Sequence, residues 1–116
     1  MALYRLYAGP DGVSHIEDLG LATHPHLEAP GPAVSAWFHE TPAESFQDWH
    51  SAPRRQWVVI LRGELEIGLG DGTFRRFGPG DARLVEDTAG RGHTTRVVGS
   101  GPCLAMYVPV GADAGP

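Results

Sequence analysis

The sequence predicts an all-β domain, built as a sandwich or a closed barrel, and three observations support this prediction. Gly and Pro are abundant, at 16 and 10 of 116 residues, and neither recurs with a fixed period. They separate short apolar runs, a pattern typical of many short strands joined by tight turns. Helical periodicity is absent apart from a possible turn near residues 42–44. Eight or more short strands in one small domain are typical of sandwiches and barrels.

The strand predictions follow from apolar runs bounded by turn residues. Residues 3–7 are apolar and aromatic, and a Gly-Pro-Asp-Gly turn separates them from a second strand at 13–21. Residues 24–32 contain three prolines, which cannot donate to a sheet ladder, so a loop or irregular edge is expected there. The clearest strand is 56–61, which is rich in β-branched and aromatic residues. The other predicted strands are 34–40, 46–50, 64–69, 73–77, 82–85, 93–98 and 103–110.

Composition limits the partners and the setting. The net charge is −5, with nine Arg and no Lys, so nucleic acid and anionic membranes are poor partners and Schiff-base chemistry is excluded. No apolar stretch approaches the roughly 18 residues of a membrane span, and the first five residues lack signal-peptide features. A cytoplasmic setting is therefore expected. The lone Cys103 lies in an apolar run and is expected to be a buried structural thiol.

Residues 49–93 contain a spaced set of polar residues and glycines that resembles the two-motif signature of the cupin family. The first family motif places a His-x-His pair shortly before a Glu, with six residues between that Glu and a Gly. His50 occupies the first His position, Ala52 the second, Gln56 the Glu position and Gly63 the closing Gly.

The second family motif begins with a Gly, continues with five residues and a Pro-x-Gly, and ends with a His after two further residues. Gly80 opens it here, Glu86 stands where Pro is expected, and His93 comes two residues later than in the family. The run Glu-Asp-Thr-Ala-Gly-Arg-Gly-His at 86–93 is similar to that of small single-domain bacterial cupins. The resemblance covers about half of the chain. It implies one all-β domain over 1–116, a cupin-type double-sheet jelly-roll barrel with its core at about 34–110 and N-terminal strands at 3–21.

The resemblance also implies a site inside the barrel, where family members gather imidazoles and a carboxylate around a divalent metal such as Zn, Fe, Ni, Mn or Cu. Here the ligands would be His50, Gln56 and His93, because Ala52 cannot ligate and Gln56 is neutral. The cofactor expected is therefore either none or one such metal. In a metal-free site, His50 and His93 would act as general acid and base near neutral pH. Gln56 would then orient a substrate carbonyl or hydroxyl.

Four more residues are candidates for contact with a small-molecule substrate, and three of them also have a structural alternative. Trp37 could stack on a ligand, or it could belong to the core or an interface. Arg54 could hold a carboxylate at the pocket mouth, or form part of a solvated surface pair. Tyr107 could point into the barrel. Asp48 shares a strand face with His50 and could lie near its imidazole, or it could sit in water at the barrel mouth.

Three functions are consistent with these residues. The first is a lyase, isomerase or cyclase that uses His50 and His93 as acid and base. The second is a metal-dependent oxygenase, and the third is a binding or sensing module without chemistry. The incomplete ligand set favours the first over the second, and the polar residues retained in the barrel favour it over the third. A homodimer is also expected, because the apolar strand at 3–7 could be lent to a partner sheet.

Overall fold

The computed structural model describes residues 2–31, 33 and 35–111, and nearly all of its regular structure is β-strand. Strands 46–50, 82–85 and 93–98 have the predicted bounds, and the other predicted strands are present with shifted ends. The elements of the described residues are β1 (Leu3–Ala8), β2 (Ser14–Leu19), the 3-10 helix η1 (Pro25–Glu28), β3 (Trp37–Thr41), β4 (Phe46–His50), β5 (Gln56–Arg62), β6 (Glu64–Gly68), β7 (Phe74–Phe77), β8 (Ala82–Val85), β9 (His93–Val98) and β10 (Cys103–Pro109).

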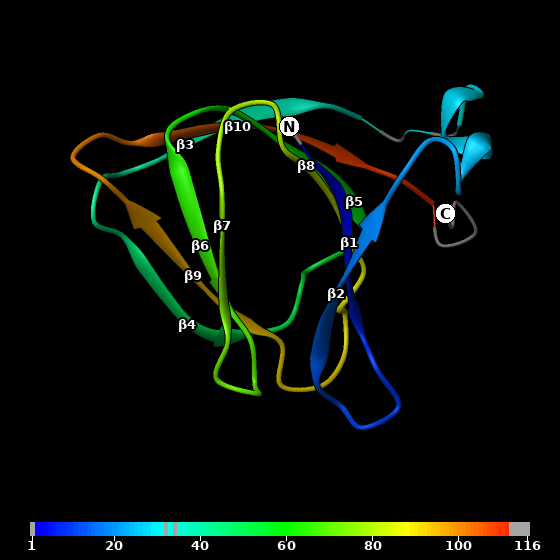
Figure 1. Ribbon diagram of the computed structural model, residues 1–116. Helices are drawn as coiled ribbons and strands as arrows, with labels where there is room; N and C mark the ends of the chain where they lie inside the picture. The colour runs from blue at the N-terminus through cyan, green and yellow to red at the C-terminus, as the bar shows by residue number, and fades with distance from the viewer. Residues whose placement is uncertain (1, 32, 34, 112–116) are drawn as a thin grey trace.

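The strands form two sheets that face each other across the interior (Figure 1). One sheet has six strands in the order β2-β1-β8-β5-β10-β3, and the other has four in the order β4-β9-β6-β7. Strand pairing is antiparallel except between β1 and β8, which run parallel. This double-sheet arrangement is the predicted jelly-roll barrel.

Side chains alternate between the interior and the outside of the barrel along each strand. On β8, Arg83 and Val85 face the interior, while Ala82 and Leu84 face an outer groove beneath residues 21–31 and 33. Much of the interior is filled by an apolar cluster in which the Tyr4 ring stacks on Phe77 at 3.8 Å between centroids. The members of this cluster are Tyr4, Leu6, Ile60, Leu65, Ile67, Phe77, Val97 and Cys103. The buried position of Cys103 agrees with the expected structural thiol.

Three local features differ from the sequence prediction. The loop at 24–32 contains the short helix η1, which buries no residue. The strand predicted at 34–40 is observed at Trp37–Thr41, because its partner β10 pairs with it only over residues 103–107, with Tyr107 opposite Trp37; Val34 lies outside the described residues. Strand β1 is not an edge, since β2 and β8 pair with its two sides. The homodimer therefore stays a prediction, but an unpaired β1 edge can no longer be given as the reason for it.

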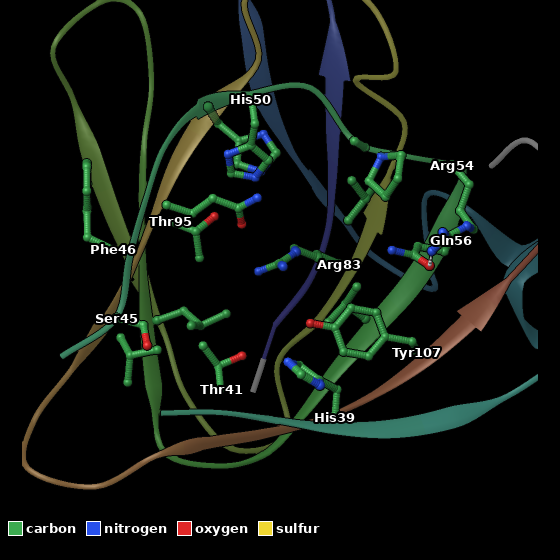
Figure 2. Close-up of a pocket in the computed structure, with 18 of the residues that line it drawn as sticks. His39, Thr41, Ser45, Phe46, His50, Arg54, Gln56, Arg83, Thr95 and Tyr107 are labelled. Carbon is green, nitrogen blue, oxygen red and sulfur yellow. Dashed lines mark hydrogen bonds between the residues drawn. The ribbon is translucent and has the colours of Figure 1, made fainter. Parts of the chain in front are cut away.

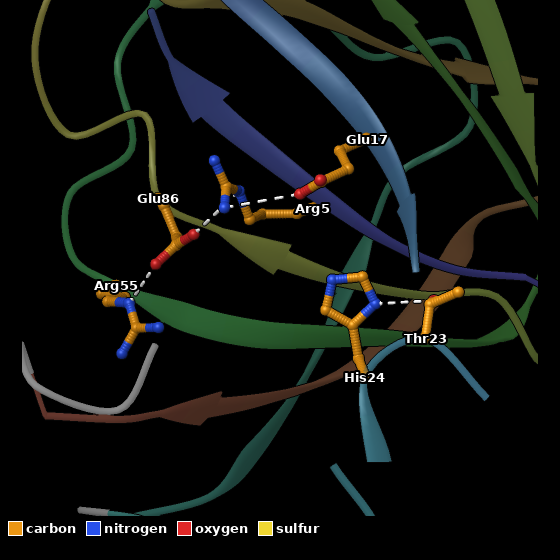
Figure 3. A network of polar contacts seen from close by, with 6 residues as sticks. All are labelled: Arg5, Glu17, Thr23, His24, Arg55 and Glu86. Atoms are coloured by element: carbon orange, nitrogen blue, oxygen red, sulfur yellow. Dashed lines mark hydrogen bonds and ion pairs between the residues drawn. The ribbon is translucent and has the colours of Figure 1, made fainter. Parts of the chain in front are cut away.

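The outer face of β1 and β8 is joined by an ion-pair network (Figure 3). The Glu86 carboxylate receives the Arg5 guanidinium at 3.3 Å and also pairs with Arg55. Arg5 contacts Glu17 on β2 at 3.4 Å. Glu86 follows β8 directly, so the network fixes the chain where the segment 86–93 leaves the sheet. None of the described helices is long and apolar enough to cross a membrane.

Candidate functional site

A cavity of about 360 Å³ lies between the two sheets. This volume is within the range of small-molecule sites, roughly 300–1,000 Å³. Its wall is contributed by β3, β4, β5, β6, β8, β9 and β10, by Ser45 before β4 and by residues that follow β4. Polar groups from both sheets face the space, with His50 on one wall and Tyr107 and His39 on another (Figure 2). The cavity is the candidate site.

His50 and His93 meet at one end of this cavity. Their strands pair in register, His50 opposite His93, and the ring centroids are 4.4 Å apart with the rings inclined by 60°. The His50 Nδ1 lies 2.7 Å from the Asp48 carbonyl oxygen. Because a carbonyl oxygen can only accept, Nδ1 carries the hydrogen and Nε2 is the ring nitrogen left for a ligand. Burial lowers the pKa of His50, and charge on His93 adds to the lowering, so a neutral imidazole is favoured.

His93 is held from behind by a carboxylate that the sequence prediction did not single out. The Asp87 Oδ2 lies 2.5 Å from His93 Nδ1 and accepts a second hydrogen bond, 2.7 Å long, from the Ser14 hydroxyl. Asp87 is 0% exposed and His93 is 3% exposed. The carboxylate orients the ring and leaves Nε2 free to face the cavity, as in catalytic His-carboxylate pairs.

Backbone contacts hold the two motif segments together. The Ala52 N–H donates to the Asp87 carbonyl at 2.8 Å, so the position that lacks the family's second His instead supports the carboxylate segment. Gly92 has a φ of 81° and passes against the His50 carbonyl so closely that a side chain has no room there. The register between His50 and His93 therefore depends on this glycine.

Gln56, Arg54, Trp37 and Tyr107 also line the cavity. Arg54 donates to the Gln56 Oε1 at 3.4 Å and lies 5.5 Å above the Trp37 ring. The Trp37 and Tyr107 rings are parallel, with centroids 5.9 Å apart. Figure 2 shows Gln56 beside Arg54, away from the His50 ring. The structure thus brings Gln56 into the same cavity as the two histidines, on a different part of its wall.

Asp48 does not reach the imidazole through its carboxylate. Its side chain accepts a hydrogen bond from the Trp49 N–H at 2.9 Å and is exposed, and only its backbone carbonyl contacts His50. The expectation that Asp48 and His50 share a strand face fails because the pairing of β4 with β9 is irregular between Gln47 and His50. Asp48 is not among the residues that line the cavity.

Arg83 and His39 line the cavity as well, and neither was predicted as a site residue. Arg83 is the only charged residue of β8, Ala-Arg-Leu-Val, and is 7% exposed. An arginine within an apolar strand is a signal that sequence reasoning could have used. The His39 and Tyr107 rings meet edge to face, with their centroids 6.2 Å apart.

The donors in this cavity do not fit a tightly held divalent metal. Among the described residues, no three His, Cys, Asp or Glu side chains gather in a way that could hold an ion. His50 and His93 offer one free nitrogen each, and Gln56, the third predicted ligand, is a neutral amide placed beside Arg54. The buried Arg83 cation faces the same space and opposes a second positive charge.

Comparison with known proteins identifies the architecture. No family model matches the sequence, and no curated protein matches it. A conserved protein with a double-stranded β-helix domain from Klebsiella pneumoniae has a similar structure, with a TM-score of 0.52, 20% identity, and coverage of 74% of this chain and 73% of that one. The polyketide cyclase RemF from Streptomyces resistomycificus has a TM-score of 0.54 and 15% identity, with coverage of 92% and 73%. At these identities the likeness concerns the fold. The chain therefore has the double-stranded β-helix fold of the cupins.

Proposed function

We propose that the cavity is the active site of an enzyme that moves a proton within a small organic molecule, a reaction of the lyase, isomerase or cyclase kind. The observation that carries this proposal is the pair of facing imidazoles, His50 and His93, one of which is backed by a fully buried carboxylate. A binding module has no need of a buried Asp-His pair, whereas proton transfer by an imidazole is favoured when a carboxylate orients the ring and supplies a countercharge.

The two rings have different surroundings, and this difference suggests their roles. His50 is favoured in its neutral form, so its Nε2 lone pair can accept a proton from an acidic C–H of the substrate. His93 has the Asp87 carboxylate as a countercharge, so it can carry the proton that is then delivered to the substrate from Nε2. Acid and base assignments of this kind arise where neighbouring groups have contrasting environments.

The fold neighbours are consistent with this proposal, since one of them is described as a polyketide cyclase. Cyclisation of a polyketone begins with removal of a proton next to a carbonyl and ends with protonation of an oxygen, which the two rings could perform in turn. The identity of 15% transfers no substrate to this chain.

Deuterium exchange tests the proposal without a known product. The protein is incubated in D₂O with a panel of ketones and β-keto compounds, and deuterium at the carbon next to the carbonyl is followed by NMR. Wild type is expected to accelerate exchange of at least one compound. His50→Gln is expected to lower that rate by roughly a hundredfold or more. Asp87→Asn should lower it too, because an amide can turn its NH₂ group toward Nδ1 and select the wrong tautomer.

His24→Gln is the matched control, since His24 lies outside the cavity and its ring contacts the Thr23 hydroxyl at 2.9 Å (Figure 3). It should exchange at the wild-type rate. Compounds that bind without any exchange would contradict the proposal and favour a binding module. Oxygen consumption that requires added metal would favour the oxygenase.

A further inference from the structure

Arg83 is a buried cation at the centre of the six-stranded sheet. On β8 it is paired between Val58 of β5 and Tyr4 of β1, so it cannot swing to the barrel surface from an edge. Its side chain extends into the cavity between His50 and Tyr107 (Figure 2). It is 7% exposed.

The guanidinium has unused hydrogen-bonding capacity. Within the described residues, its Nε and Nη1 are buried and have no hydrogen-bond partner. Its polar neighbour on the sheet is Tyr4, a neutral phenol that shares a side-chain hydrogen bond with Arg83; burial raises the pKa of Tyr4 to about 12, and Arg83 only partly opposes this increase. A buried charge without a counterion is costly, so Arg83 is a site for a negatively charged group.

The remaining charges of the wall point the same way. The described residues that line the cavity include two arginines, three histidines and no Asp or Glu. Asp87 is behind His93 and is not among them. The chain as a whole has a net charge of −5, so this concentration of basic groups is local and not a reflection of composition.

The shape of the wall indicates what carries the negative charge. Trp37 and Tyr107 present parallel rings, and Arg54 lies over Trp37 beside them. One buried arginine balances one negative charge and presents a planar donor set that matches a carboxylate. A phosphate group carries more charge and has no second buried cation here.

We propose that Arg83 binds the carboxylate of the substrate, and that the substrate is a small aromatic or similarly flat organic acid. This inference rests on the proposed function in one respect: it assumes that the molecule bound in the cavity is the substrate. Arg83 would anchor the acid group while the rest of the molecule extends along Trp37 and Tyr107. His50 and its neighbour His93 lie on the other side of Arg83, so they would face the part of the molecule next to the anchored acid group.

The test uses 2-naphthoate and its neutral isostere 2-naphthamide as probes, with affinities measured by calorimetry at low salt. Wild type is expected to bind the acid at least about tenfold more tightly than the amide, because a charge-assisted hydrogen bond is lost in the amide. Arg83→Met should remove this preference. Arg76→Gln, which changes an exposed arginine on β7, should keep it.

Thermal unfolding without ligand adds a readout that a merely structural Arg83 would not give. Removing a buried charge that has no counterion should leave the melting temperature of Arg83→Met equal or higher, whereas loss of a structural contact would lower it. Arg83→Gln serves as the second variant if the Met variant does not fold. Equal binding of acid and amide by wild type, binding of neither, or a preference that survives in Arg83→Met would overturn the inference.

A third probe, 2-naphthyl phosphate, separates the two kinds of anion: tighter binding than the naphthoate would refute the carboxylate assignment. The outcome is also separable from that of the exchange experiment. Binding of naphthoate through Arg83 without proton exchange on any compound would refute the proposed catalysis and leave this inference standing. Proton exchange that is lost in His50→Gln but unchanged in Arg83→Met would support the proposed catalysis and refute this inference.

Discussion

Gly92→Ala is the change that tests the geometry of the site most directly, because it needs no substrate. Gly92 precedes His93 and has a φ of 81°, in the left-handed region. A Cβ there would overlap the His50 carbonyl and come within 2.6 Å of the Ser51 nitrogen. These are backbone atoms, so no side-chain rotation can relieve the overlap. The segment after His50 must separate from the loop before His93.

The magnitude has two parts, and the chain contains a control that isolates one of them. A left-handed backbone costs an L-residue about 1–2 kcal/mol. Gly99 has a φ of 86°, yet a Cβ there would meet nothing within 4 Å, so Gly99→Ala should cost only this amount. Gly92→Ala adds the displacement of the His50 backbone, and its total loss is expected to exceed about 4 kcal/mol.

Unfolding in guanidinium chloride, monitored by circular dichroism, measures the loss of unfolding free energy in each variant, and thermal unfolding gives the corresponding change in melting temperature. For a domain of this size, a loss of 1 kcal/mol lowers the melting temperature by roughly 3–6 °C. Gly99→Ala should therefore melt several degrees below wild type, and Gly92→Ala well over ten degrees below or not fold. Equal losses in the two variants would refute the close approach of these segments and, with it, the facing arrangement of the histidines.

Two further predictions follow from the site. Burial lowers the pKa of His50 in the folded state, so the unfolded chain binds the proton more readily. The free energy of unfolding should therefore fall as the pH drops from 6.5 through the lowered pKa of His50. Denaturant titrations from pH 8 to pH 5 measure this fall, and His50→Gln should make it smaller. Gln56→Glu should leave Zn²⁺ affinity within about tenfold of wild type by calorimetry, because Arg54 is the neighbour that a carboxylate would pair with there. A gain of about a hundredfold would revive the metal hypothesis.

The sequence allowed the strands to be predicted because their signals are local, such as the glycines that follow β5 and β6 and precede β8. The resemblance to the cupin motifs implied that His50 and His93 would share one cavity, which both line in the structure. Asp48 shows where such reasoning stops. Two residues of separation imply a common face only on a regular strand, and the pairing of β4 is irregular at that point.

The direction in which Arg83 points and the role of Asp87 could not be assigned from sequence for a different reason. All four residues of β8 are buried, because one face lines the interior and the other lies beneath residues 21–31 and 33. Alternation of polar and apolar residues, the usual guide to facing, is therefore absent from this strand. Asp87 belongs to a run of turn-like residues, where its role depends on its distant partner Ser14, 73 positions away.

The positions of Arg83, His50 and Asp87 link the proposed anchor to the proposed base. Burial lowers the pKa of His50 first of all, then charge on His93, with a smaller contribution from Arg83. A carboxylate bound to Arg83 would offset the field of the guanidinium and introduce a negative charge into the cavity. His50 would then accept a proton more readily with the acid bound than in the empty cavity. Asp87, which is hydrogen-bonded behind His93, stays out of contact with this anion and keeps its role toward the second ring. An acidic substrate would in this way favour the proton transfer that it undergoes.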